Sequence, residues 1–119
     1  GVVLIEAVTI MVMSGVDDGT EYRFKARSDG RILDDQWVIS IGRKENNDLC
    51  LKRDTFISRH HARLFWKDDR WWLEDNKSTN GTFTENADNM FEDHKVSGII
   101  PIQPGELFRV GRTWLRIQA

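Results

Sequence analysis

The fold is decided most clearly by residues 61–75, which read HARLFWKDDRWWLED. Two aromatic and aliphatic runs flank the polar residues 67–70, and aspartate is common in tight turns because its side chain bonds to nearby backbone. Two such runs joined by so short a turn predict an antiparallel β-hairpin. Trp71 and Trp72 are consecutive, so one of them is expected to face the core and the other to face outward.

Similar short runs recur along the chain between turn formers such as Asp-Gly, Asn-Gly and Pro-Gly, and helical spacing of apolar residues is hard to find. Alternation within residues 21–25 and 113–118 indicates strands with one buried face and one wet face. The pattern is typical of an all-β sandwich or barrel. Strands are expected at residues 2–13, 21–26, 37–42, 48–51, 61–67, 70–75, 81–84, 107–110 and 113–118.

The longest stretch without a clear strand pattern is residues 85–102. Its charged residues are Glu85, Asp88, Glu92, Asp93 and Lys95. An exposed loop or a mobile insertion is expected here. The acidic part of this stretch, within residues 85–101, could occupy a cationic site as a mimic of phosphate, but a simple surface insertion is the favoured interpretation.

Length and composition predict one domain over residues 1–119. The chain is 39% hydrophobic with five Trp and six Phe, enough to bury a core of ordinary size. The single Cys50 excludes a disulfide framework or a cysteine zinc site and indicates a reducing compartment such as the cytoplasm. No apolar run approaches the roughly 18 residues that span a bilayer. Because the sequence does not start with Met and stops directly after an apolar run, we expect a piece cut from a longer protein.

Charge is distributed unevenly along the chain. The net charge is −2 with a pI near 5.9, which argues against a nucleic-acid binder. Residues 42–63 nevertheless contain six basic residues against three acidic ones. On a β scaffold, loops are where binding residues concentrate, so this stretch is a candidate site for an anion. A solvated basic edge strand is the alternative.

Three motifs follow one another in the chain: Gly42-Arg43, Ser58-Arg59-His60-His61 and Ser78-Thr79-Asn80-Gly81-Thr82. In this order, and with apolar runs between them, they make the sequence resemble the forkhead-associated (FHA) domain family over about residues 10–117. The resemblance implies an all-β fold, a two-sheet antiparallel β-sandwich of about eleven strands. It also implies that loops at one end of the sandwich bind a peptide through phosphothreonine.

The resemblance assigns roles to particular side chains. It implies that the phosphate is held by Arg43, Ser58, Arg59 and Thr79, and that the peptide backbone is held by Asn80. A phosphate carries about −1.5 to −2 charge and three acceptor oxygens, which the planar donor fork of arginine matches. An asparagine amide offers both a donor and an acceptor. Solvated arginines and a plain Asn-Gly turn are the structural alternatives.

Structural support of the site is expected from Gly42, His61, Ser78 and Gly81. The resemblance implies that His61 braces the loop that presents Ser58. Family members also read a residue downstream of the phosphothreonine, partly through the loop before Ser58. If Ile57 points into the core, Phe56 lies near the peptide, and an apolar downstream residue is then expected.

Catalysis and metal binding are not expected. His60 and His61 would point to opposite faces of a strand, which does not suit a shared metal. A Ser58/His61/Asp75 hydrolase is conceivable, but no Gly-x-Ser-x-Gly elbow surrounds the serine. The sequence therefore predicts a domain without metal or cofactor that is not an enzyme.

The expected function is phosphothreonine-dependent binding, as an adaptor in Ser/Thr kinase signalling, with a Ser/Thr kinase or its substrate as partner. Nucleic acid and membrane insertion are not expected. The alternative is an interaction or assembly domain of the same fold that binds an unphosphorylated partner through a sheet face or an exposed Trp.

Overall fold

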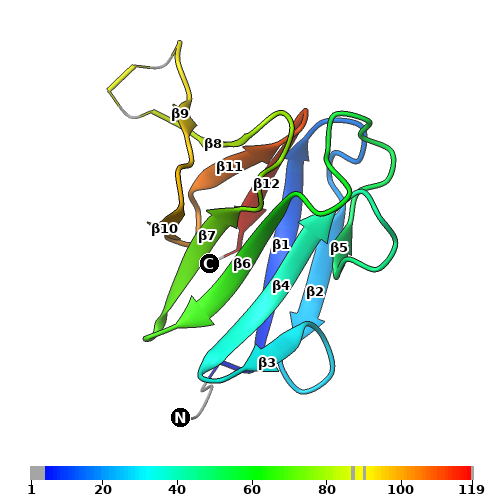
Figure 1. Cartoon of the computed structure of the whole chain (residues 1–119), viewed down its shortest axis with the longest axis vertical. Helices are drawn as coiled ribbons and strands as arrows, with labels where there is room; N and C mark the ends of the chain where they lie inside the picture. The colour runs from blue at the N-terminus through cyan, green and yellow to red at the C-terminus, as the bar shows by residue number, and fades with distance from the viewer. Residues whose placement is uncertain (1–4, 87, 90, 119) are drawn as a thin grey trace.

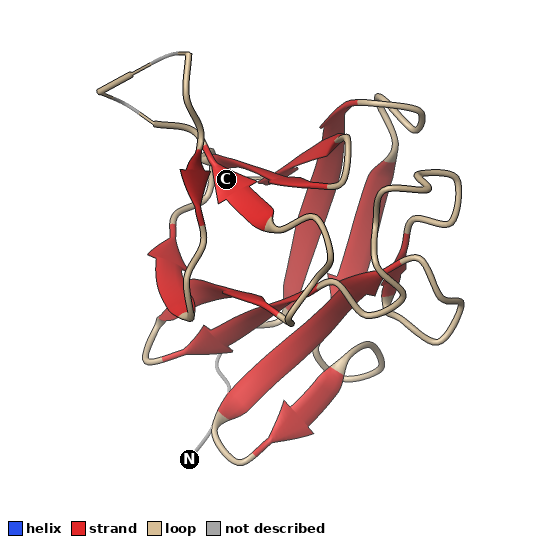
Figure 2. Cartoon of the chain, turned by 45° about the horizontal axis from the view of Figure 1, so that its top comes forward, coloured by secondary structure: helices blue, strands red, loops and turns tan. Residues whose placement is uncertain are grey.

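The computed structural model describes residues 5–86, 88–89 and 91–118, which form twelve β-strands and no helix. These strands build two sheets that face each other (Figures 1 and 2). The first sheet has the order β2 (Glu21–Lys25), β1 (Ala7–Ser14), β12 (Thr113–Ile117), β11 (Leu107–Val110), β8 (Thr82–Thr84) and β9 (His94–Lys95). The second has the order β10 (Ile99–Ile102), β7 (Arg70–Asp75), β6 (Ala62–Lys67), β4 (Gln36–Gly42) and β3 (Arg31–Leu33), with β5 (Leu49–Cys50) beside β4.

Every strand pair is antiparallel except β4 and β5, so the expected antiparallel sandwich is confirmed. The strand count is twelve, against the expected number of about eleven. No helix in the described ranges is long and apolar enough to cross a membrane.

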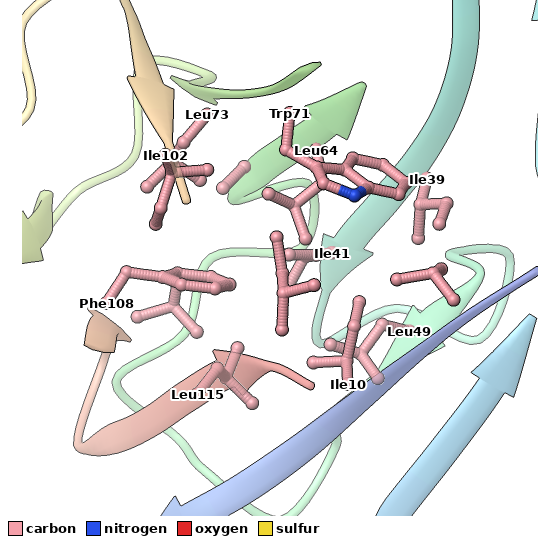
Figure 3. Packing of buried hydrophobic residues seen from close by; sticks show 14 of the residues in the cluster. Ile10, Ile39, Ile41, Leu49, Leu64, Trp71, Leu73, Ile102, Phe108 and Leu115 are labelled. Atoms are coloured by element: carbon pink, nitrogen blue, oxygen red, sulfur yellow. The ribbon is translucent and has the colours of Figure 1, made fainter. Parts of the chain in front are cut away.

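The core lies between the two sheets. Alternate side chains of each strand point inward, as in β12, where Leu115 is buried between partly exposed neighbours. Figure 3 shows Ile10, Phe108 and Leu115 of the first sheet packed against side chains of the second, such as Leu64. Burying each such side chain stabilises the fold by about 1.5–3 kcal/mol before the cost of ordering the chain.

The predicted hairpin over residues 61–75 is confirmed as β6 and β7, which pair along their whole length. Asp68 and Asp69 both have positive φ, 54° and 58°, as the two-residue turns that match strand twist require. Trp71 is 2% exposed in the core, whereas Trp72 lies on the outer face and stacks on Phe65 with 6.4 Å between the ring centroids.

Two sequence interpretations were wrong or incomplete. Residues 85–102 are not a loop throughout, because they contain β9 and β10, and β3 was not predicted. All three are short, largely exposed strands at sheet edges, so neither length nor alternation marks them. Pro101 also argues locally against a strand, yet proline is tolerated at an edge, where β10 has only β7 as neighbour. The expected strand at residues 2–13 begins outside the described residues.

The connections that carry the three motifs gather at the upper end of the sandwich in Figure 1, opposite the β6–β7 hairpin. They are the β4–β5, β5–β6 and β7–β8 loops, and the β11–β12 turn lies at the same end. We call this group of loops the loop end.

Candidate functional site

Gly42 closes β4 and lets two loops touch. A Cβ at this position would lie 2.2 Å from the carbonyl oxygen of Arg59 and 2.6 Å from Nδ2 of Asn47. Just beyond it, the backbone N–H of Arg43 donates to the carbonyl of Ser58 at 3.0 Å. The first motif is thus held against the second by backbone pairing that only glycine permits.

Asn47 fastens the same two loops from inside, and sequence reasoning missed it. Its side chain is 7% exposed, and Nδ2 donates to the carbonyls of Lys44 at 2.8 Å and Arg59 at 2.7 Å. One amide group therefore satisfies backbone acceptors from both loops. The only local signal is an asparagine in a polar turn, which does not distinguish this role from an ordinary turn residue.

His61 connects the second motif to the third. Its ring is fully buried, Nδ1 accepts the backbone N–H of Ser58 at 2.9 Å, and Nε2 donates to the carbonyl of Gly81 at 2.8 Å. The neutral tautomer with its hydrogen on Nε2 satisfies both bonds. Burial lowers the pKa of His61, more than the neighbouring carboxylates and the bond to Gly81 raise it, so the ring stays neutral.

Ser58 and Thr79 lie side by side across this connection. The hydroxyl oxygen of Ser58 accepts the backbone N–H of Thr79 at 3.0 Å, which leaves the hydroxyl proton for another acceptor. Ser58 is half-buried and Thr79 is exposed. Because both ring nitrogens of His61 are bound to backbone groups, the histidine has no free nitrogen to take a proton from Ser58. The conceivable hydrolase triad is therefore not assembled.

Asp75 organises the third motif instead. Its carboxylate accepts the hydroxyls of Ser78 at 2.5 Å and Thr82 at 2.7 Å, and the Ser78 hydroxyl in turn accepts the N–H of Gly81 at 2.9 Å. Burial by itself raises the pKa of Asp75, but these hydrogen bonds outweigh burial and the pKa lies below its ordinary value. The carboxylate therefore stays ionised. Gly81, which ends this motif's turn, adopts the positive φ of 86° that glycine tolerates.

Arg43 and Arg59 are both exposed and bring positive charge to these hydrogen-bonded loops. Nε of Arg43 donates to the carbonyl of Ile57 at 2.9 Å, a bond that fixes the side chain and does not use its two terminal nitrogens. Nearby Lys52 and Arg53 instead form ion pairs with carboxylates, at 3.7 and 3.1 Å. Within the described ranges, no carboxylate lies within ion-pair distance of Arg43 or Arg59.

Asn80 joins the third motif to the loop before Ser58. Its Nδ2 donates to the carbonyl of Phe56 at 2.9 Å, which leaves one amide hydrogen and the amide oxygen for a ligand. Ile57 is 1% exposed in the core and Phe56 is 41% exposed, as alternation led us to expect. Asn80, which is expected to hold the peptide backbone, is therefore bonded to the backbone of the residue that carries this exposed ring.

The β11–β12 turn also belongs to this end, and the sequence did not indicate it. Asp54, which is 5% exposed, accepts the N–H of Phe56 at 2.9 Å, the N–H of Arg112 at 2.8 Å and the hydroxyl of Thr113 at 2.7 Å. Gly111 has φ of +56°, and a Cβ there would lie 2.6 Å from a side-chain atom of the β5–β6 loop. The segment Asp54-Thr55-Phe56 indicates only a local turn, whereas Arg112, whose backbone N–H also donates to Asp54, lies 58 residues away.

Two cavities lie away from the loop end, and the described residues form no metal-binding cluster. A cavity of about 640 Å³ lies along β1, β2 and β3, and a groove of about 520 Å³ lies on the outer face of the second sheet; neither is lined by the motif residues. Across the described residues, no group of three or more His, Cys, Asp and Glu side chains could hold a metal. Cys50 is half-buried, with Sγ 3.6 Å from the carbonyl oxygen of Arg43.

The chemistry available at the loop end is therefore recognition of an anion. Two unpaired arginines and a serine hydroxyl are donors, and donors of this kind bind phosphate oxygens through charge-assisted bonds. Neutral His61 and the ionised carboxylate of Asp75 hold these loops together, and both are already engaged in hydrogen bonds within the protein.

Comparison with known proteins gives an independent result. A family model described as FHA domain matches residues 39–111. FhaB, an FHA domain-containing protein of Mycobacterium tuberculosis, is 31% identical over 93 residues, which cover 78% of this chain and 55% of FhaB. FhaB of Mycolicibacterium smegmatis is 32% identical over 80 residues, which cover 67% of this chain and 46% of FhaB. The chain thus spans about half the length of these curated relatives.

Solved structures give the same architecture. A structure from a study of phosphothreonine-dependent FHA domain interactions is 25% identical, with a TM-score of 0.69 over 95% of this chain and 96% of the other. The FhaA FHA domain complexed with the intracellular domain of Rv3910 is 25% identical, with a TM-score of 0.67 over 93% of this chain and 99% of the other. The FHA domain of a hypothetical Arabidopsis thaliana protein is 20% identical, with a TM-score of 0.72 over 95% and 85%.

Proposed function

The chain belongs to the FHA domain family, and from this premise we propose that its loop end binds a protein or peptide that contains phosphothreonine. The observation that carries the proposal is the bridge through His61, which holds the Ser58 loop against the Gly81 turn. Through this bridge the Ser58 hydroxyl, whose proton remains available, lies beside Arg43 and Arg59, which have no carboxylate partner among the described residues. A protein that is 25% identical was studied for phosphothreonine-dependent interactions, which supports the same ligand.

Each candidate side chain has a role in this proposal. Arg43 binds the phosphate through its two terminal nitrogens, since Nε already holds the Ile57 carbonyl. Ser58 donates its hydroxyl proton, while Arg59 and Thr79 complete the phosphate shell from the neighbouring loops. Asn80 holds the ligand backbone with its remaining amide hydrogen and its amide oxygen.

The domain then acts as an adaptor and carries out no reaction. Its partner is a Ser/Thr kinase or a substrate of one, because such kinases produce phosphothreonine. We expect the domain in the cytoplasm or another reducing compartment, because the thiol of Cys50 is free. A short peptide covers little surface, so we expect a dissociation constant near 1 μM, about 8 kcal/mol of binding free energy.

The test is titration of an oriented library of phosphothreonine peptides, followed by the best peptide in its phosphothreonine, phosphoserine and unphosphorylated forms. Only phosphorylated forms should bind, with phosphothreonine the tightest. Arg43→Ala should abolish measurable binding, because it removes the best-anchored phosphate donor. Equal affinity for the unphosphorylated peptide would overturn the proposal.

The matched control for Arg43→Ala is Arg31→Ala. Arg31 is also exposed, but it lies on the edge strand β3, away from the loop end (Figure 1), so its loss should leave affinity unchanged. Chemical unfolding of both variants tests whether the fold is intact. If both variants lose binding equally, general electrostatics explains the effect and the assigned role of Arg43 is wrong.

A second candidate function is binding of an unphosphorylated partner on the outer face of the second sheet. It is favoured by the groove of about 520 Å³ there, where Trp72 stacks on Phe65 and the guanidinium of Arg70 lies 5.4 Å from the Trp72 ring. Trp72→Ala separates the two candidates, because it should leave phosphopeptide affinity unchanged.

A further inference from the structure

The edge strand β2 and the turns that flank it carry opposite charges at their two ends. Residues 17–27 read DDGTEYRFKAR, with acidic residues before Tyr22 and basic residues after it. Glu21 and Arg23 flank Tyr22 directly and are exposed, and among the described residues neither has an opposite charge within ion-pair distance. Such a segment is complementary to itself when two copies run antiparallel, because each acidic end then faces a basic end.

One edge of β2 is free to pair, since β1 is its only neighbour in the sheet that the described residues form. The carbonyl of Thr20 accepts the N–H of Val12 at 2.9 Å. The N–H of Ala26 donates to the carbonyl of Glu6, also at 2.9 Å. Because the direction of hydrogen bonding alternates along an antiparallel strand, the even-numbered residues of β2 bond to β1 and the odd-numbered residues face the free edge.

The turn after β2 closes one of these odd-numbered positions and leaves two open. The N–H of Lys25 donates to the carboxylate of Asp29 at 2.7 Å, and the carbonyl of Lys25 accepts the N–H of Asp29 at 2.8 Å. The backbone groups of Glu21 and Arg23 form no hydrogen bond on this edge within the part of the chain that the structure describes. The open positions are therefore the two that carry opposite charges beside Tyr22.

The open backbone groups and the charges favour the same register for a second copy. Antiparallel pairing about Tyr22 puts Glu21 of each copy opposite Arg23 of the other, and both of these pairs can exchange their backbone hydrogen bonds. Pairing about Arg23 would put two arginines opposite each other and would set Glu21 against Lys25, whose edge the turn covers. Pairing about Glu21 would put two carboxylates opposite each other.

The charges beyond the paired residues fit the register about Tyr22 as well. Asp18 and Ala26 are equally far from Tyr22 along the chain, so Asp18 of one copy lies toward Lys25 and Arg27 of the other. These three charged side chains are exposed, and none of them forms an ion pair with another described residue. Charges on an edge strand ordinarily prevent pairing, but opposite charges at symmetric positions permit one register and oppose the others.

We propose that two copies of this chain associate through β2 into a twofold dimer whose first sheets join edge to edge. The contact is short, so the dimer is weak, with a dissociation constant of roughly 10–500 μM. Because β2 runs from the loop end toward the opposite end of the sandwich, antiparallel pairing points the two loop ends in opposite directions (Figure 1). One dimer then connects two phosphothreonine ligands. This consequence rests on the proposed function, whereas the dimer itself does not.

The test is analytical ultracentrifugation of the chain without any ligand, at concentrations from about 10 μM to about 1 mM. The parent chain should form dimers as its concentration rises. Glu21→Arg and Arg23→Glu should each weaken association by roughly tenfold or more, because each variant puts like charges opposite each other at both pairs. Arg31→Glu is the matched control and should leave association unchanged, because Arg31 is exposed on the edge strand β3 of the other sheet.

Restoration of the dimer distinguishes this contact from a general effect of charge. An equimolar mixture of the Glu21→Arg and Arg23→Glu chains should associate as tightly as the parent, because every pair is again of opposite charge. A chain that carries both substitutions should associate equally well by itself. A parent chain that is monomeric at about 1 mM, association that survives both single substitutions, or a failure of the mixture and the double variant to associate would each overturn the inference. No phosphothreonine peptide takes part in these measurements, so the proposed function would still stand.

Discussion

The loop end and the acidic β8–β9 loop are both rich in polar residues, yet the polar side chains of the two regions bond to different partners. At the loop end, Asn47 and His61 bond to backbone groups of other loops, at 2.7 and 2.8 Å. In the β8–β9 loop, Asn86 and Asn89 accept N–H groups two residues further along the same loop, at 2.9 and 3.0 Å. This loop projects from the sandwich in Figure 1.

A polar loop can serve as a rigid site only when its hydrogen bonds reach other loops. Bonds within one loop can be replaced by water when the loop is exposed, so they cost little to lose. Bonds between loops through a buried group such as His61 leave backbone donors and acceptors unsatisfied when they break. The two regions should therefore respond very differently to similar substitutions.

The largest effect is expected for Gly42→Ala. The added methyl group would overlap the Arg59 carbonyl, so the two loops would have to separate, at a cost of about 3 kcal/mol or more in the free energy of unfolding. Gly98→Ala, directly before β10, is the control, because its Cβ meets nothing within 4 Å and only the positive φ of 67° opposes it, at about 1–2 kcal/mol. Urea unfolding measures both, and equal losses would contradict the comparison.

His61→Ala should follow, with a loss of about 2–4 kcal/mol, because it strips the N–H of Ser58 and the carbonyl of Gly81 of their partner and leaves a cavity. His60→Ala is the neighbouring control. His60 is exposed and has one long contact to Asn47, at 3.4 Å, so its loss should stay within about 0.5 kcal/mol. Similar losses for the two histidines would mean that the bridge is not what holds the loops.

Acid should weaken the loop end through the same histidine. Folding lowers the pKa of His61 below its ordinary value of 6.5, so in acid the unfolded chain binds a proton that the folded chain does not. The free energy of unfolding should therefore fall as the pH drops below about 6.5. Urea unfolding at pH 7.5, 6.5 and 5.5 measures this decline. His60→Gln should retain it in full, and a flat profile in the parent protein would contradict the prediction.

The smallest effects are expected in the β8–β9 loop. Asp93→Asn removes a partly exposed ion pair with Arg109, at 3.4 Å, and should cost no more than about 1 kcal/mol. Asp88→Asn combined with Glu92→Gln should change phosphopeptide affinity by less than about twofold, because the Glu92 carboxylate bonds to Asn89 of its own loop. A clear gain in affinity would revive the interpretation of this loop as a phosphate mimic.

Much of the fold could be predicted because its signals are local. Alternation in residues 113–118 and the turn at residues 67–70 identify strands and a hairpin without knowledge of the rest of the chain. The edge strands β3 and β10 could not be predicted this way. They are short and largely exposed, and they form because a neighbouring strand offers backbone groups to pair with.

The residues of the candidate site also differ in whether a local sequence pattern reveals their role. Arg43, Ser58 and Asn80 could be proposed from the order of the motifs, since each lies in a short segment with a recognisable pattern. Asn47 and Arg112 could not, because nothing in their own segments shows what they contact. Their roles depend on loops that approach each other only in the folded chain.

The all-β character of the domain can be predicted from the amino-acid sequence, because strand periodicity and turn chemistry act between near neighbours. The order in which its loops carry arginine, serine and asparagine can also be taken directly from the sequence. Which groups meet at the loop end depends on the folded chain. Asp54 holds Arg112 from 58 positions away, and His61 reaches Gly81 from 20. Such contacts arise because packing two sheets brings distant loops together, and a buried polar group there must find a partner wherever it lies in the chain.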